Sequence, residues 1–217
     1  MARLKDEKQR KLSSRLWLER QLKDPYVLRA KRDGFRSRAA YKLAEIDDKY
    51  HVLKEGARVV DLGAAPGGWS EIAVKRIGPQ GRVIALDILD LLPITGVEFL
   101  KLDFLDATAP DRLKVMLGGK ADVVLSDMAA NATGHRKTDH LRIMALAEAA
   151  TLFAREVLDE RGSFLCKVLQ GGTETVLLAE LKRDFETVKH VKPPASRADS
   201  AELYLLARGF RHRSRTD

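Results

Sequence analysis

Short apolar runs that alternate with helical patterns restrict the fold of this chain more than any other feature. Seven runs read as strands, at 58–63, 82–87, 97–103, 121–127, 163–169, 185–191 and 202–209. Helical spacing is found at 36–50, 67–78, 111–117, 138–158 and 173–184. Strands that alternate with helices predict an α/β fold with a mostly parallel sheet and helices on both faces. Because no helix separates the last two runs, we expect one antiparallel strand near an edge.

Several strands end in an aspartate, which indicates a ligand site. Asp87, Asp103 and Asp127 each end a strand, and DLGAAPGGWS (61–70) forms a glycine turn that opens a helix. In a doubly wound sheet, ligands bind beyond the carboxyl ends of the strands, and a helix N-terminus offers free N–H groups. A single aspartate there is often a helix N-cap, but three at one edge favour a binding site.

The sequence of the glycine turn limits the choice of ligand. A dinucleotide is one candidate, but Gly63 is followed two residues later by Ala65, so G-x-G-x-x-G is not met. S-adenosylmethionine fits better: Asp87 suits its ribose and Asp103 its adenine amine, and the glycine turn suits its sulfonium and amino acid. We therefore expect S-adenosylmethionine as cofactor and S-adenosylhomocysteine as product, with no metal.

The positive charge is concentrated at the N-terminus. Residues 1–42 hold 14 Lys and Arg against 5 Asp and Glu, whereas the other 175 residues are nearly neutral. Such a segment, with aromatic side chains between its charges, favours RNA binding over a solvated tail without a partner. We predict an RNA-contacting basic arm (1–35), a single catalytic domain (36–210) and a basic tail (211–217).

Other classes of protein are disfavoured. The longest apolar runs are too short to span a membrane, and the N-terminus lacks the apolar core of a signal peptide. Cys166 is the single cysteine, and no Cys/His spacing suits zinc. The sequence therefore predicts a cytoplasmic protein, without disulfides, that acts as a monomer.

Six segments occur in an order that resembles the FtsJ-type ribosomal RNA 2′-O-methyltransferases: RSRAAYKLAEI, VVDLGAAPGGWS, LDFLD, LSDMAAN, KVLQG and SRADSAELY. The resemblance runs from about residue 13 to residue 209 and implies a Rossmann-like, S-adenosylmethionine-dependent methyltransferase with a seven-stranded sheet. It implies cofactor contacts at Gly67, Trp69, Asp87, Asp103 and Asp127. It also implies a catalytic Lys-Asp-Lys-Glu tetrad, formed by Lys42, Asp127, Lys167 and Glu202.

Lys167 ends an apolar strand, where an ammonium group is costly unless it is paired or used. Methyl transfer from a sulfonium requires an aligned ribose hydroxyl that loses its proton. The sequence leaves two chemical roles open for Lys167: a neutral amine that takes this proton, or a charged ammonium that orients the hydroxyl. A purely structural pairing with Glu202 is the third possibility.

The resemblance predicts 2′-O-methylation of a uridine in large-subunit (23S) ribosomal RNA, on the assembled or assembling subunit. A transfer RNA 2′-O-methyltransferase is the alternative with the same chemistry. A non-catalytic RNA-binding assembly factor is an alternative of another class, and the intact tetrad argues against it.

Overall fold

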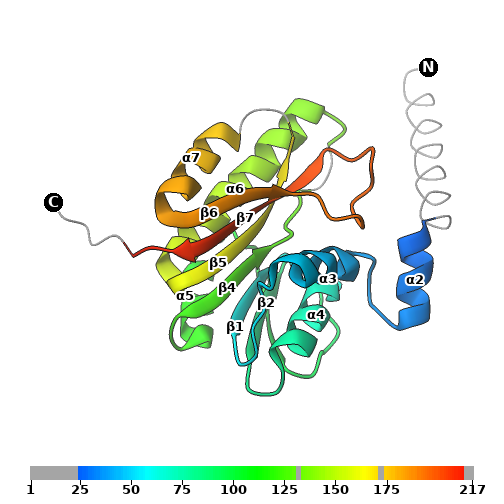
Figure 1. Ribbon diagram of the computed structural model, residues 1–217, viewed down its shortest axis with the longest axis horizontal. Helices are drawn as coiled ribbons and strands as arrows, with labels where there is room; N and C mark the ends of the chain where they lie inside the picture. Colours follow the sequence, from blue (N-terminus) through cyan, green and yellow to red (C-terminus); the bar gives the residue numbers. More distant parts are fainter. Residues whose placement is uncertain (1–23, 131–132, 171–173, 213–217) are drawn as a thin grey trace.

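The computed structural model describes residues 24–130, 133–170 and 174–212. Within them, a seven-stranded sheet runs through the centre (Figure 1). Its strands are β1 (Arg58–Leu62), β2 (Arg82–Asp87), β3 (Val97–Lys101), β4 (Ala121–Ser126), β5 (Leu158–Leu169), β6 (Phe185–Val191) and β7 (Glu202–Phe210). They lie in the order β3-β2-β1-β4-β5-β7-β6, and β7 is antiparallel to both of its neighbours. The predicted α/β architecture is confirmed.

Helices cover both faces of the sheet. The described helices are α2 (Pro25–Asp33), α3 (Ala39–Tyr50), α4 (Gly68–Ile77), α5 (Ala109–Leu117), α6 (Arg136–Val157) and α7 (Glu174–Asp184). Helices α3 and α4 bury side chains such as Leu43 and Ile72 against one face. Helices α5, α6 and α7 bury side chains such as Leu113, Phe153 and Leu177 against the other. Each face therefore has its own apolar core, and the predicted placement of helices on both faces is confirmed.

The order of strands places a ligand site at one edge. Strand order reverses between β1 and β4, which are hydrogen-bonded neighbours although β2 and β3 lie between them in sequence. In such sheets the crevice for a ligand lies outside the carboxyl ends of the strands at this point. We call this side of the sheet the carboxyl edge. Both the glycine turn after β1 and Asp127 after β4 lie there.

Strand β5 begins five residues earlier than the run at 163–169 predicted. Leu158 pairs with Ala121, and the pairing shifts register before Val123 pairs with Ser163. Arg161, in the irregular part, has a left-handed backbone with φ of 64°. Between these two pairs β5 advances five residues while β4 advances two, and the intervening segment DERG (159–162) is charged and not apolar, which is why the predicted run began only at 163.

Helix α2 lies inside the range that the sequence assigned to the basic arm. Asp24 caps its N-terminus by accepting a hydrogen bond from the Tyr26 amide, and Pro25 occupies its first turn. The ring of Tyr41 lies 5.5 Å from that of Tyr26 and 5.3 Å from that of Phe35. Because Tyr41 is only 5% exposed, its ring packs inside the protein and is not available to RNA bases. Residues 1–23 and 213–217 lie outside the described residues.

Candidate active site

The turn after β1 brings two backbones into close contact. The amides of Gly63 and Ala64 both donate to the Leu86 carbonyl, which fixes the turn against β2. Gly63 has φ of 80°, and a Cβ placed on it would lie 2.8 Å from the backbone of Met128. Glycine is therefore required here for both conformation and space. The turn leads directly into α4, whose N-cap is Gly67, without a side-chain cap.

Asp87 holds the glycine turn in place. Its Oδ2 accepts a 2.8 Å hydrogen bond from the Ala65 amide, and its Oδ1 accepts one of the same length from the Leu89 amide. The carboxylate thus joins the turn after β1 to the loop after β2. Asp103 is exposed beyond β3, and its Oδ1 accepts from the Leu105 amide at 2.9 Å. Two of the three predicted cofactor aspartates, Asp87 and Asp103, therefore lie at the carboxyl edge.

Arg36 fastens the loop after β2 next to the glycine turn. Its guanidinium donates to the carbonyls of Leu92 and Pro93, each at 2.7 Å, and its Nε lies 3.3 Å from Glu71. A Cβ on Gly67 would lie within 3.0 Å of the Arg36 side chain and of this loop. The glycine is therefore covered on one side by the loop that carries Leu91 and Ile94.

Trp69 faces the core with its side chain. Only 2% of it is exposed, and its indole nitrogen donates to the Ala39 carbonyl at 2.9 Å. Its ring centroid lies 5.6 Å from that of Tyr204. A cofactor contact at Trp69 would therefore come from its backbone.

The structure brings all four tetrad residues together from four elements. Lys42 lies on α3, Asp127 follows β4, Lys167 lies in β5 and Glu202 begins β7. The Lys42 Nζ lies 2.7 Å from one Glu202 oxygen and 2.8 Å from the other. The Lys167 Nζ donates to the Asp127 carbonyl oxygen at 2.6 Å and lies 3.1 Å from Asp127 Oδ1. The tetrad thus consists of two ion pairs.

Tyr204, which the sequence analysis did not single out, connects the two pairs. Its hydroxyl accepts from Lys42 Nζ at 3.2 Å and donates to Asp127 Oδ1 at 2.9 Å. Burial raises the pKa of this hydroxyl well above its usual value, and the charges of Asp127 and Glu202 act in the same direction. Tyr204 therefore stays a neutral donor. Tyr204 lies two residues after Glu202, so the two side chains are on the same face of the strand. This spacing could have indicated Tyr204 from the sequence.

The pKa values of two carboxyl groups at this edge, Asp127 and the fully buried Asp61, are shifted in opposite directions. Shelter from water acts to raise the pKa of Asp127, but the charges of Lys167 and Lys42 outweigh it and lower the pKa. Burial raises the pKa of Asp61 to about 7, although its hydrogen bond from the Ser70 hydroxyl opposes the shift. Asp61 was not predicted as a site residue, although it opens the DLGAAPGGWS segment.

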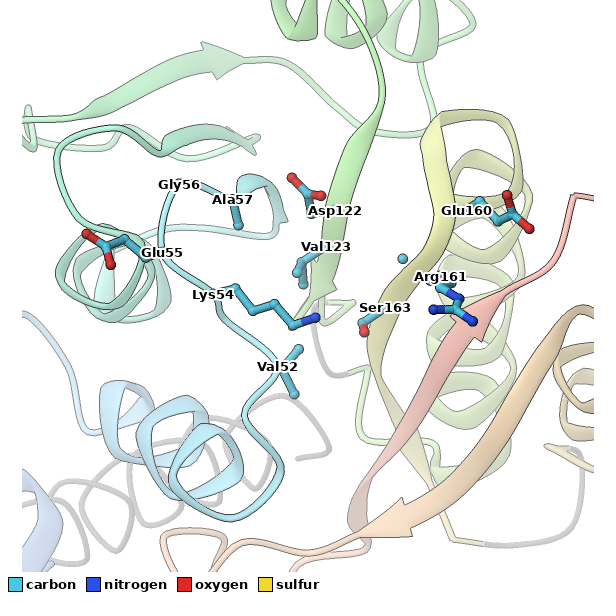
Figure 2. A pocket seen from close by; sticks show the side chains of 11 residues that line it. Val52, Lys54, Glu55, Gly56, Ala57, Asp122, Val123, Glu160, Arg161 and Ser163 are labelled. Atoms are coloured by element: carbon cyan, nitrogen blue, oxygen red, sulfur yellow. The ribbon is translucent and has the colours of Figure 1, made fainter.

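A cavity of about 250 Å³ lies at the opposite edge of the sheet (Figure 2). It is lined by the loop before β1, by the start of β4 and by the irregular part of β5, with Lys54 pointing toward Ser163. None of the tetrad or predicted cofactor residues lines it. It is therefore separate from the carboxyl edge.

The described part of the chain has neither a metal-binding cluster nor a membrane-spanning helix. No group of three or more His, Cys, Asp or Glu side chains there is placed to hold a metal ion. None of the helices described combines the length and the apolar composition that a membrane span needs.

Comparisons with known proteins identify the family of this chain. A family model described as FtsJ-like methyltransferase matches residues 35–210. The ribosomal RNA large subunit methyltransferase E of Rhodopseudomonas palustris is 67% identical over 204 residues, which cover 93% of this chain and 87% of that protein. The protein of the same name from Azorhizobium caulinodans is 63% identical over 212 residues, covering 96% and 88%.

Solved structures share the fold. A crystal structure from Plasmodium falciparum, described as a ribosomal RNA methyltransferase, has a TM-score of 0.75 and 30% identity. The match covers 82% of this chain and 100% of that one. A structure from Clostridium thermocellum, with a TM-score of 0.52 and 19% identity, shows likeness of fold alone.

Proposed function

Because the chain belongs to the FtsJ-like methyltransferase family, we propose that it methylates the ribose 2′-hydroxyl of a uridine in large-subunit ribosomal RNA. The methyl donor is S-adenosylmethionine. The observation that carries the proposal is the Lys-Asp-Lys-Glu tetrad, assembled at the same edge as the glycine turn. The names of the relatives support the class of substrate.

The residues at the carboxyl edge suit S-adenosylmethionine. The start of α4, which has no side-chain cap from Gly67, leaves backbone N–H groups to face a ligand. Asp87 and Asp103 present carboxylates at the ends of the next two strands, where ribose hydroxyls and an adenine amine need acceptors. The bound cofactor supplies an electrophilic methyl group. The side chains of the chain hold and orient both reactants.

The contacts of Lys167 indicate what it does to the ribose. Two positions around its nitrogen are directed at Asp127, through the carbonyl oxygen and Oδ1. One position remains for the 2′-hydroxyl. If that position is a lone pair, Lys167 removes the proton; if it is an N–H, Lys167 fixes the orientation of the hydroxyl. Asp127 sets this orientation in either case, because it holds the amine from two sides.

The other two tetrad members, Glu202 and Lys42, help to hold the same arrangement of side chains. Glu202 holds the ammonium of Lys42 through both oxygens, and Lys42 reaches Asp127 through Tyr204. All four residues come from one chain, so a monomer is sufficient for the chemistry. Since the proposed substrate is the ribosomal subunit, we also expect the protein to work in the cytoplasm.

Labelled S-adenosylmethionine tests the proposal directly. The protein is incubated with unmodified large subunits, naked ribosomal RNA and transfer RNA in separate reactions. We expect label in the RNA of the large subunits, with ribose methylation shown by resistance of the modified linkage to alkali. Label in transfer RNA alone would support the transfer RNA alternative. Binding to subunits without any label would support a non-catalytic assembly factor.

A further inference from the structure

The loop 192–201, between β6 and β7, ends at the tetrad glutamate. Within it, the Ser196 hydroxyl donates a 2.9 Å hydrogen bond to Glu202 Oε1, the same oxygen that lies 2.7 Å from Lys42 Nζ. The Ser196 side chain is sheltered, since the residue is only 6% exposed. A hydroxyl has a single proton to donate, so this bond fixes the rotamers of both side chains. Glu202 therefore has two donors, and one of them lies outside the tetrad.

The residue before Ser196 is held through both of its backbone groups. The Ala195 amide donates to Glu45 Oε2 at 2.7 Å, and the Ala195 carbonyl accepts from Arg38 Nη2. Ala195 is fully buried. Glu45 lies on α3, and Arg38 lies immediately before it. The place of Ser196 is thus determined by α3 as well as by its own loop.

Helix α2 and its N-cap contact Glu45 and Arg38, the two side chains that bind the Ala195 backbone. The Tyr26 hydroxyl donates to the second oxygen of Glu45 at 2.8 Å. Asp24, which caps α2, lies 3.1 Å from Arg38 Nη1 and accepts from Arg197 Nε at 3.1 Å. Asp24 is 8% exposed, so these contacts are sheltered from water, where hydrogen bonds to charged groups are strongest.

Helix α2 precedes the part of the chain that the family model matches, which begins at residue 35. Its contacts nevertheless lead in three steps from Tyr26 to Glu45, from Glu45 to Ala195 and from Ser196 to Glu202. Ala30, Tyr41 and Ala195 form a small apolar cluster beneath these hydrogen bonds. Figure 1 shows α2 beside α3, outside the sheet and its covering helices.

We propose that Ser196 is a positioning residue for Glu202, and that α2 maintains this position through the backbone bonds of Ala195. The inference rests on the proposed function, because Glu202 matters only if the tetrad transfers a methyl group. Helix α2 is then part of the catalytic scaffold. The residues before it are free to bind RNA without this task.

The first test is Ser196→Ala, measured as kcat and KM for large subunits. We expect kcat to fall about tenfold or more, the usual weight of a hydrogen bond to a charged group. A positioning role leaves the KM for RNA and the cofactor Kd within about twofold. Ser196→Thr keeps the hydroxyl and should recover most of kcat. Ser163→Ala, a serine of similar exposure at the opposite edge, is the control. A wild-type kcat for Ser196→Ala would overturn the proposal.

The second test addresses α2. Tyr26→Phe removes the hydroxyl that holds Glu45 and keeps the ring, with Tyr50→Phe on α3 as the control. We expect faster hydrogen exchange at the Ala195 amide in Tyr26→Phe, and a fall in kcat that is not additive with that of Ser196→Ala. Additive effects or unchanged exchange would remove α2 from the proposal.

The exchange measurement needs no substrate, so it separates the two proposals. If wild-type protein fails to methylate large subunits while Tyr26→Phe still accelerates exchange at Ala195, the substrate assignment fails and the mechanical link remains. If wild-type protein is active and Ser196→Ala is equally active, the positioning role fails and the proposed function remains.

Discussion

The Tyr204 hydroxyl donates a 2.9 Å hydrogen bond to Asp127 Oδ1, the oxygen that also lies 3.1 Å from Lys167 Nζ. Lys42 donates to the same hydroxyl from the other side. The two lysines are therefore connected through shared partners. Groups that act as a unit show non-additive effects when they are removed. Substitutions of Lys42 and Lys167 should accordingly be far from additive in rate.

Lys167→Ala should abolish most of the turnover and leave binding intact. We expect the single-turnover rate to fall by at least ~10², the lower range of general-base catalysis, with unchanged affinity for S-adenosylmethionine and RNA. The rate of the wild-type protein against pH then separates the two chemical roles. A rate that rises with pH indicates a neutral amine as base, and a flat profile indicates a charged orienting group. A stable variant with wild-type turnover would contradict both.

Asp87→Asn should weaken the cofactor selectively. The carboxylate accepts from two backbone amides, and an asparagine has one oxygen for both. Lost hydrogen bonds of a charged acceptor are worth ~1.5–3 kcal/mol, so affinity for S-adenosylmethionine should fall about ten- to a hundredfold by calorimetry. Asp90→Asn, an exposed aspartate that pairs with Lys101, is the control. If both variants bound the cofactor equally well, Asp87 would have a structural role in the loop and no role in cofactor binding.

Removal of residues 1–23 should affect RNA and not the cofactor. This segment contains eight Lys and Arg and ends just before Asp24. Each lost phosphate contact lowers the slope of log K against log salt by up to ~0.9. We expect weaker RNA binding with a smaller slope, and unchanged melting temperature. A truncation to residue 35 also removes α2, and should lower kcat in addition. An unchanged slope after the shorter truncation would indicate a tail without a partner.

Asp61→Asn should change how stability depends on pH. Burial raises the pKa of Asp61 to about 7, whereas an unfolded aspartate titrates near ~4. Below about pH 4, Asp61 is protonated in both the folded and the unfolded state. Between about pH 4 and 7 only the unfolded state loses the proton, so the group costs stability as pH rises, by up to ~1.4 kcal/mol per pH unit. In urea unfolding, the free energy of unfolding of the variant should therefore rise relative to that of the wild type as the pH increases across this range. Parallel curves would mean that Asp61 is ionised throughout.

The alternation of strands and helices could be predicted because each element has its own periodicity. The antiparallel β7 also followed from the missing helix between residues 191 and 202. Helix α2 was not predicted, although Asp24 and Pro25 are a cap and a first-turn residue. The charge of the segment suggested an RNA-contacting arm, and the packing of Tyr26 and Tyr41 that holds the helix also involves the distant Ala195.

The tetrad could be named from the resemblance, but its connections could not. Whether Tyr204 reaches Asp127 depends on the pairing of β7 with β5, in which Tyr204 lies opposite Lys167. Ser196 reaches Glu202 only because Glu45 and Arg38 fix Ala195. The contacts of Ala195 with Glu45 and Arg38 join residues more than a hundred positions apart, and no local pattern reports them.

The reversed direction of β7 decides which loop of the chain lies near the substrate. In a parallel strand of this sheet, the first residue would lie at the far edge, about 20 Å from the site for a strand of six residues. Because β7 runs the other way, Glu202 and the loop before it lie at the carboxyl edge instead. The antiparallel direction therefore brings a loop from the second half of the chain, with Ser196 and Arg197, to the same edge as the turns after β1 and β2.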